Sequence, residues 1–174
     1  MMVNLILFIH IALLLQLTSP EQVVPINPVK PVTVCEVLGD LQKYRGKIIQ
    51  IRGRWLGTSL DGHECKPLRT GDYGWESGIA IAEPDWPILE TPATWTLDRK
   101  ALDRAEQEMR LQAIRYNKHV IVTFIGRLDA REEGLQTFRG GDGNLHGLGY
   151  GHLGVYPAQL VIATVRDIVP VPKE

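Results

Sequence analysis

The stretch Lys47–Leu56 (KIIQIRGRWL) alternates mostly between apolar and polar residues. A period of two is typical of a strand that has one face in the core and the other toward solvent. We therefore expect Ile49, Ile51 and Trp55 to face inward. Gly53 lies inside this predicted strand, where a glycine usually marks a bulge or a sharp bend of the kind that a small closed barrel requires.

Other segments have the same strand character. His119–Leu128 (HVIVTFIGRL) also contains a glycine followed by an arginine, at Gly126. Ser77–Ala82 predicts a short strand, and Ala158–Val169 (AQLVIATVRDIV) predicts the last one. A hairpin-like unit is expected around Asp61-Gly62.

Two helices accompany the predicted strands. Thr33 followed by Glu36 forms a capping box, and Gly46 lies where a left-handed C-terminal cap would end the helix. The apolar residues of this first helix recur on one face, at Val34, Val37, Leu38, Leu41 and Tyr44. Helical spacing returns from Leu97 to Tyr116, with charged residues opposite an apolar stripe. That stripe consists of Leu97, Ala101, Leu102, Ala105, Met109, Ala113 and Tyr116.

The resulting order is one helix, three strands, a long helix and two strands, which is the order of a five-stranded OB barrel. The predicted fold is therefore mainly β with helices. We expect a five-stranded OB-like barrel over residues 32–174, with an N-terminal helix and a long helix between its third and fourth strands. A single domain also suits a chain of 174 residues.

The first 20 residues are predicted to be a signal peptide or an N-terminal anchor. Val3–Leu17 is uncharged and almost wholly apolar, and its length suits a secretory segment better than a membrane span. Export is the favoured interpretation, but the absence of Lys and Arg before the segment and the poor cleavage site at Thr18-Ser19-Pro20 weaken it and leave an uncleaved anchor open. The alternative is an apolar first strand or helix of a cytosolic domain. Residues 21–31 hold several prolines and are expected to form an extended tether.

Three segments resemble a group of small exported bacterial proteins of unknown function that have an OB-like fold. They are Thr33–Leu38, Tyr44–Gly53 and Gly151–Val161, and the likeness spans roughly residues 32–170. The resemblance implies the fold and export to the periplasm or the extracellular space, but it implies no reaction. A cysteine in the first helix and another after the first strand recur in that group, and Cys35 and Cys65 match them.

In an exported chain, a disulfide between Cys35 and Cys65 is the favoured interpretation. Two alternatives stay open. A metal pair would lack the CxxC spacing and the further cysteines that zinc sites use, and two buried free thiols would be inert.

The segment Gly140–Gly154 (GGDGNLHGLGYGHLG) is the candidate binding loop. It is not a phosphate-binding P-loop, because no Lys follows and the next element is a strand. A metal site would need His146 and His152 to join Asp142, or His63 and Glu64, at spacings that match no standard site. A glycine-rich loop between the last two strands of an OB barrel flanks the ligand face, so we expect ligand contacts from His146, Tyr150, His152 and Tyr156. In the structural alternative, His152 binds backbone and fixes a tight turn.

The predicted function is an extracytoplasmic binding module without catalytic residues, metal or cofactor, whose partner is an envelope protein, a peptide or a glycan. Trp75, Trp86 and Trp95, interleaved with prolines, are candidates for an aromatic platform, although such residues often pack a loop against a barrel. No GxSxG, HExxH or SxxK motif is present. Any membrane attachment would run through an uncleaved N-terminus.

The alternative function is an OB-type single-stranded nucleic-acid binder or hydrolase. The chain has 19 Lys and Arg against 20 Asp and Glu, so it offers no excess positive charge to a polyanion. Nucleic acid is therefore an unfavoured partner. A local patch would restore this alternative, and its candidates are Arg52, Arg54, Arg127, Arg131 and Arg139, with Glu83 as a carboxylate.

Overall fold

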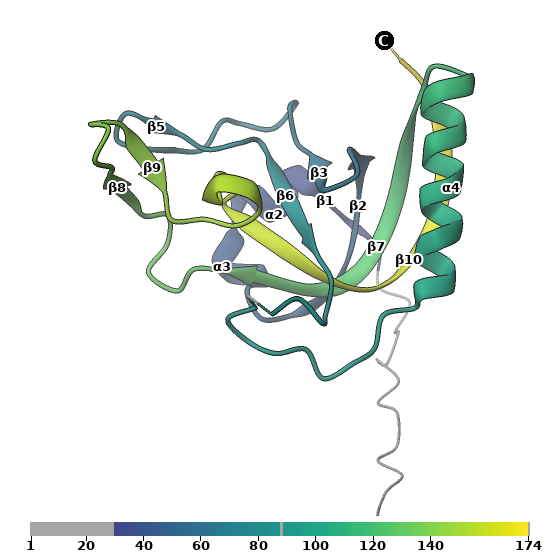
Figure 1. Cartoon of the computed structure of the whole chain (residues 1–174), viewed down its shortest axis with the longest axis horizontal. Coiled ribbons are helices and arrows are strands. Elements are labelled where there is room, and N and C mark those ends of the chain that lie inside the picture. Colours follow the sequence, from purple (N-terminus) through teal and green to yellow (C-terminus); the bar gives the residue numbers. More distant parts are fainter. Residues whose placement is uncertain (1–29, 88, 174) are drawn as a thin grey trace, which may run out of the picture.

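The computed structural model describes residues 30–87 and 89–173. The predicted signal peptide or anchor and residues 21–29 of the predicted tether lie outside the described residues. The described chain is mainly β, and five strands close into a barrel in the order β2, β3, β6, β10, β7 and back to β2 (Figure 1). These strands are β2 (Ile48–Trp55), β3 (Ser59–Asp61), β6 (Gly78–Ala82), β7 (Lys118–Ala130) and β10 (Ala158–Pro172). β6 and β10 run parallel, and the other four pairings are antiparallel.

The barrel interior is filled by alternate residues of the strands, as the period of two requires. Ile51 and Trp55 of β2 are buried, and Ile49 packs against the core. The inward orientation predicted for these three side chains is therefore confirmed. Phe124 of β7 is fully buried and contacts the Trp55 ring edge-on at 5.2 Å between centroids.

Gly53 and Gly126, the two glycines predicted to lie inside strands, allow neighbouring groups to approach closely. A Cβ on Gly53 would lie 2.7 Å from Val34 Cγ2, and one on Gly126 would lie 2.3 Å from the Val161 carbonyl oxygen. The register shift beside Gly126 belongs to the partner strand, β10, between Ile162 and Thr164. The glycine thus faces a bulge instead of forming it.

The N-terminal helix differs from the prediction of one continuous helix. After the short strand β1 (Val32–Thr33), the chain forms α2 (Val34–Gly39) and then a separate helix, α3 (Leu41–Tyr44). The break has a local cause, since the Asp40 carboxylate accepts the Lys43 amide and starts a new helix. The predicted capping box of Thr33 and Glu36 is confirmed, and hydrogen bonds from Thr33 lower the pKa of Glu36.

The long helix α4 (Arg99–Arg115) lies between β6 and β7 in the chain and packs along β7 and β10 (Figure 1). Its first half is buried through Ala101, Leu102 and Ala105, whereas Ile114 near its end is 84% exposed. The predicted apolar stripe therefore packs against the core as far as Met109, whereas Ala113 and Tyr116 are exposed. Among the described residues, none of the helices has both the length and the apolar character needed to span a bilayer.

The glycine-rich segment is folded more tightly than a flexible loop. It contains the strand β9 (Leu145–Gly147), which pairs with β8 (Thr137–Arg139), and a 3-10 turn, η1 (His152–Gly154). A second small hairpin, β4 (Arg69–Thr70) with β5 (Tyr73–Gly74), lies at the same end of the molecule, opposite α4 (Figure 1).

Candidate functional site

A cleft of about 700 Å³ opens on the outer face of the barrel. One wall is the start of α2 with Thr33, Val34 and Cys35, and another is β2 from Arg52 to Arg54. The cleft is completed by the end of β3 and the turn after it, residues 61–64, and by the ends of β7 and β10. Every wall is either a barrel strand or a segment attached to one, so the cleft is built on the rigid part of the fold.

Strand alternation places charged side chains in this cleft. Because Ile51 and Trp55 point into the core, Arg52 and Arg54 point outward on the same face of β2. Arg54 is paired across the ladder with Ile121 of β7, and His119 lies two residues before Ile121 on the same face.

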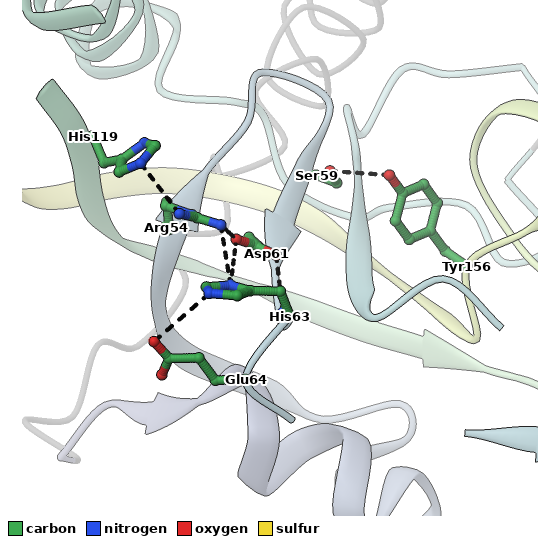
Figure 2. Close-up of polar contacts among 7 residues, drawn as sticks. All are labelled: Arg54, Ser59, Asp61, His63, Glu64, His119 and Tyr156. Carbon is green, nitrogen blue, oxygen red and sulfur yellow. Dashed lines mark hydrogen bonds and ion pairs between the residues drawn. The ribbon is translucent and has the colours of Figure 1, made fainter. Parts of the chain in front are cut away.

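Arg54 is the centre of a polar cluster (Figure 2). Its Nη2 donates to Asp61 Oδ2 and lies 3.0 Å from His63 Nδ1, while its Nη1 lies 3.3 Å from His119 Nε2. The Nε atom of Arg54 is buried and has no hydrogen-bond partner within the described part of the chain. The two Nη groups are thus committed to the cluster, and the donor capacity of Nε is unused.

Asp61 orients the His63 ring. Its side chain is only 7% exposed, and its carboxylate accepts the His63 amide at 2.9 Å and lies 2.9 Å from His63 Nδ1. The other ring nitrogen, His63 Nε2, lies 3.8 Å from the exposed Glu64 carboxylate. A protonated His63 would add a cation next to Arg54, and a neutral His63 would offer one hydrogen-bonding nitrogen.

Arg52 is the second cation of the cleft. It makes no ion pair or hydrogen bond with another residue of the ranges 30–87 and 89–173, whereas Arg54 is already engaged. A half-buried guanidinium with free donors suits a carboxylate or a phosphate, both of which accept its planar pair of N–H groups.

The cleft provides no activated nucleophile from its own walls. The Thr33 hydroxyl accepts the Glu36 amide as a helix cap, and Cys35 is bonded to Cys65. An Asp–His pair acts as a general base only on a nucleophile within hydrogen-bond reach. The lining residues are therefore suited to holding a charged group and do not by themselves assemble a catalytic triad.

The disulfide predicted between Cys35 and Cys65 is present, with the two Cα atoms 5.0 Å apart. It joins the first turn of α2 to the segment that follows Asp61, His63 and Glu64, so it ties two walls of the cleft together. Disulfides persist in oxidising compartments outside the cytosol, which agrees with an extracytoplasmic setting.

The three tryptophans predicted as a platform are not assembled into one. Trp75 is buried, and its Nε1 donates to Thr70. Trp95 donates to the Ile162 carbonyl and lies against the Arg127 guanidinium. Trp86 is 44% exposed and lines a separate cavity near the start of α4.

The residues predicted in the glycine-rich segment also lie apart from the cleft. His146 stacks on Phe138 and lies 3.1 Å from Asp142, whose pKa falls to about 2 because the Asn144 amide and side chain donate to it. Tyr150 is buried beneath Arg131. None of the seven predicted ligand contacts lines the cleft.

The turn around His152 is held by backbone hydrogen bonds. Gly149 donates to the Gly154 carbonyl, Tyr150 and Tyr156 exchange both of theirs, and the Tyr156 hydroxyl donates to Ser59 (Figure 2). His152 is exposed and caps nothing. The tight turn of the structural alternative is therefore present, but His152 does not make it.

Only some residues of the cleft could be predicted from the sequence. Four of them were candidates only in the alternative interpretations: Arg52, Arg54, His63 and Glu64. His119 was overlooked, although it occupies an outward position of a predicted strand, the only local signal that it carries. Within the described ranges, no group of three or more His, Cys, Asp or Glu side chains is placed to hold a metal ion.

No protein-family model, curated protein or solved structure matches this chain.

Proposed function

We propose that this chain is an exported binding module on an OB-type barrel, and that the cleft binds an anionic group of an envelope peptide or glycan. The anionic group is a carboxylate or a phosphate. The observation that carries the proposal is the Arg52 guanidinium, which has no partner among the described residues and lies on the same strand face as the cluster of Arg54, His63 and His119.

The strand order supports the OB assignment. The first three strands of the barrel follow one another, and the last strand lies between the third and fourth and runs parallel to the third. The helix α4 follows the third barrel strand and precedes the fourth in the chain. Barrels of this class bind ligands on an outer strand face, and Arg52 and Arg54 lie on such a face.

The distribution of the other arginines favours a local anion site over a nucleic-acid surface. Arg127 pairs with Asp129, Arg131 pairs with Glu90, and Arg139 donates to the Gly143 carbonyl. The charges of Arg127 and Arg131 are paired within the fold, and all three arginines lie outside β2. A single-stranded nucleic acid needs a continuous basic groove with stacked aromatic rings, so we keep this function as the alternative.

The proposal is tested by titrating the full chain with sodium phosphate, and separately with sodium acetate, at constant pH and ionic strength, while recording the histidine ring signals by NMR. The ring signals of His63 and His119 should shift together as the anion binds beside Arg52. Those of His146 and His152 should stay in place. Equal shifts of all four, or none, would contradict the proposal.

Arg52→Gln is the decisive variant, because it removes the unpaired charge and leaves the cluster around Arg54 intact. We expect phosphate affinity to fall about tenfold, which corresponds to losing one charge-assisted contact. Arg69→Gln is the matched control, since Arg69 is an exposed strand arginine outside the cleft. Equal affinity of Arg52→Gln and Arg69→Gln would place the anion elsewhere.

The nucleic-acid alternative is tested by tryptophan fluorescence with a single-stranded oligonucleotide at low and physiological salt. Steeply salt-dependent binding would indicate counterion release and favour the alternative. If the chain is instead the proposed binding module, the tryptophan fluorescence should show no response that depends on oligonucleotide length.

A further inference from the structure

A second cavity, of about 390 Å³, lies between the start of α4, the β2–β3 turn and the end of β6. Its apolar lining is Trp55, Ile81, Leu102 and Ile162, of which all but Ile81 are buried. Gly57 and Thr58 line it from the β2–β3 turn. The cavity therefore has the size and the apolar lining of a small ligand site.

The two aromatic residues that line this cavity differ in exposure. Trp55 is buried, its Nε1 donates to the Gly57 carbonyl at 2.8 Å, and its ring packs on Phe124. Trp86 also lines the cavity and is 44% exposed. An exposed tryptophan face attracts a cation more strongly than the ring of tyrosine or phenylalanine does.

The charged groups of the lining are both acidic. Both oxygens of Glu83 are taken by Arg99, at 3.0 and 2.5 Å. Glu106 makes only a long contact, 3.5 Å from its Oε2 to Arg110, between two exposed side chains. Its Oε1 has no donor among the described residues. The cavity thus offers one open carboxylate oxygen beside an exposed tryptophan.

We infer that this cavity binds the side chain of a lysine from a peptide partner. Four methylenes would lie along Ile81 and Leu102, and the ammonium would meet Glu106 Oε1 and the Trp86 ring. One open oxygen suits the point charge of an ammonium, whereas an arginine fork requires two parallel acceptors. The site is independent of the anion cleft, because the two cavities share no lining residue.

The test titrates the full-length chain with Nα-acetyl-lysine methylamide and follows the four tryptophan indole N–H signals by NMR. The signals of Trp55 and Trp86 should shift with one dissociation constant, in the millimolar range expected of a small contact. Those of Trp75 and Trp95 should not move. Nα-acetyl-norleucine methylamide, which keeps the stem and lacks the charge, should bind at least fivefold more weakly.

Two substitutions separate binding from folding. Glu106→Gln should weaken lysine binding about fivefold and leave the thermal unfolding midpoint of the free protein unchanged, because the ion pair that it removes is long and half exposed. Glu108→Gln, the same change on the same helix, is the matched control and should bind like the parent chain. Arg110→Gln should leave the affinity equal or higher, since it frees Glu106.

The inference is overturned if norleucine and lysine probes bind alike, because the carboxylate would then contribute nothing. It is also overturned if Glu106→Gln and Glu108→Gln weaken lysine binding equally. Tighter binding of Nα-acetyl-arginine methylamide than of the lysine probe would overturn it as well. Shifts of all four indole signals together would indicate nonspecific association.

Discussion

The barrel contains the same dipeptide twice, Gly53-Arg54 in β2 and Gly126-Arg127 in β7, and the two arginines have opposite surroundings. The Arg127 side chain is 10% exposed and bonds to Asp129 through Nε and Nη2. Its Nη groups also donate to the Pro92 and Thr91 carbonyls. The Arg54 side chain is 26% exposed and bonds to groups that line an open cleft.

The same local motif therefore serves the fold in β7 and is available for binding in β2. Arg127 fastens the segment before α4 to the barrel wall and stacks on Trp95. Arg54 holds two histidines and one aspartate at the edge of a cavity, and its Nε has no partner among the described residues. An arginine that satisfies all its donors internally has none left for a ligand.

The largest expected effect is on stability. Arg127→Gln should lower the free energy of unfolding by about 3–5 kcal/mol, because it removes the cation beside the 13% exposed Asp129 side chain together with the hydrogen bonds to the Thr91 and Pro92 carbonyls. Arg54→Gln should cost less, about 1–2 kcal/mol, because Asp61 keeps its two contacts to His63 and no backbone carbonyl loses a donor. Urea unfolding of both variants gives the comparison. Equal losses would remove the distinction between the two arginines.

Loss of the disulfide should lower the stability nearly as much, and the local structural change should be confined to the cleft around Arg54. Replacing both Cys35 and Cys65 by Ser should cost about 3–4 kcal/mol, given a closed loop of 30 residues in the loop-closure model. In the folded fraction, the His63 ring signal should shift because its turn is no longer tied to α2. The Trp95 indole signal, next to Arg127, should stay in place. Movement of Trp95 alone would reverse the expected pattern.

The burial of Tyr150 beneath Arg131 should be visible in an alkaline titration. Burial raises the pKa of Tyr150 to about 12, so the neutral phenol is favoured in the folded state. Its contribution to stability is complete below pH 10 and is lost as the pH rises through 12. Ultraviolet absorbance should show one late-titrating tyrosine that disappears in Tyr150→Phe. Loss of an early-titrating tyrosine in that variant would mean that the Tyr150 hydroxyl is accessible to water.

The smallest effect is expected at His152. Because its exposed ring caps nothing and the turn is held by backbone bonds, His152→Ala should change the free energy of unfolding by less than about 0.5 kcal/mol. Thermal unfolding beside the parent chain measures it. A larger loss would show that the histidine fixes the turn after all.

The strands and the disulfide could be predicted because their signals are local. Alternation in β2, the capping box at Thr33 and the presence of just two cysteines need no knowledge of distant residues. The break in the first helix was missed, because Leu41 and Tyr44 continue its apolar spacing while Asp40 starts a new helix. Spacing alone does not reveal a competing cap.

The cleft depends on contacts that sequence spacing does not encode. Arg54 and His119 are 65 residues apart and meet because β2 and β7 close the barrel. The glycine-rich segment attracted attention by its composition, but several of its glycines are needed for packing. A Cβ on Gly149 would lie 2.1 Å from the Tyr156 carbonyl oxygen, and one on Gly147 would lie 2.8 Å from the Trp75 ring.

The central claim is that Arg54 holds the cluster beside Arg52, the guanidinium that binds the anion, and that Arg127 serves the fold. Its most direct test is a phosphate titration of Arg54→Gln and Arg127→Gln, each followed by the His63 and His119 ring signals under conditions where both variants are folded. We predict that Arg54→Gln loses at least tenfold in affinity and that Arg127→Gln binds like the parent chain. Unchanged binding by Arg54→Gln, or an equal loss in both variants, would contradict the account.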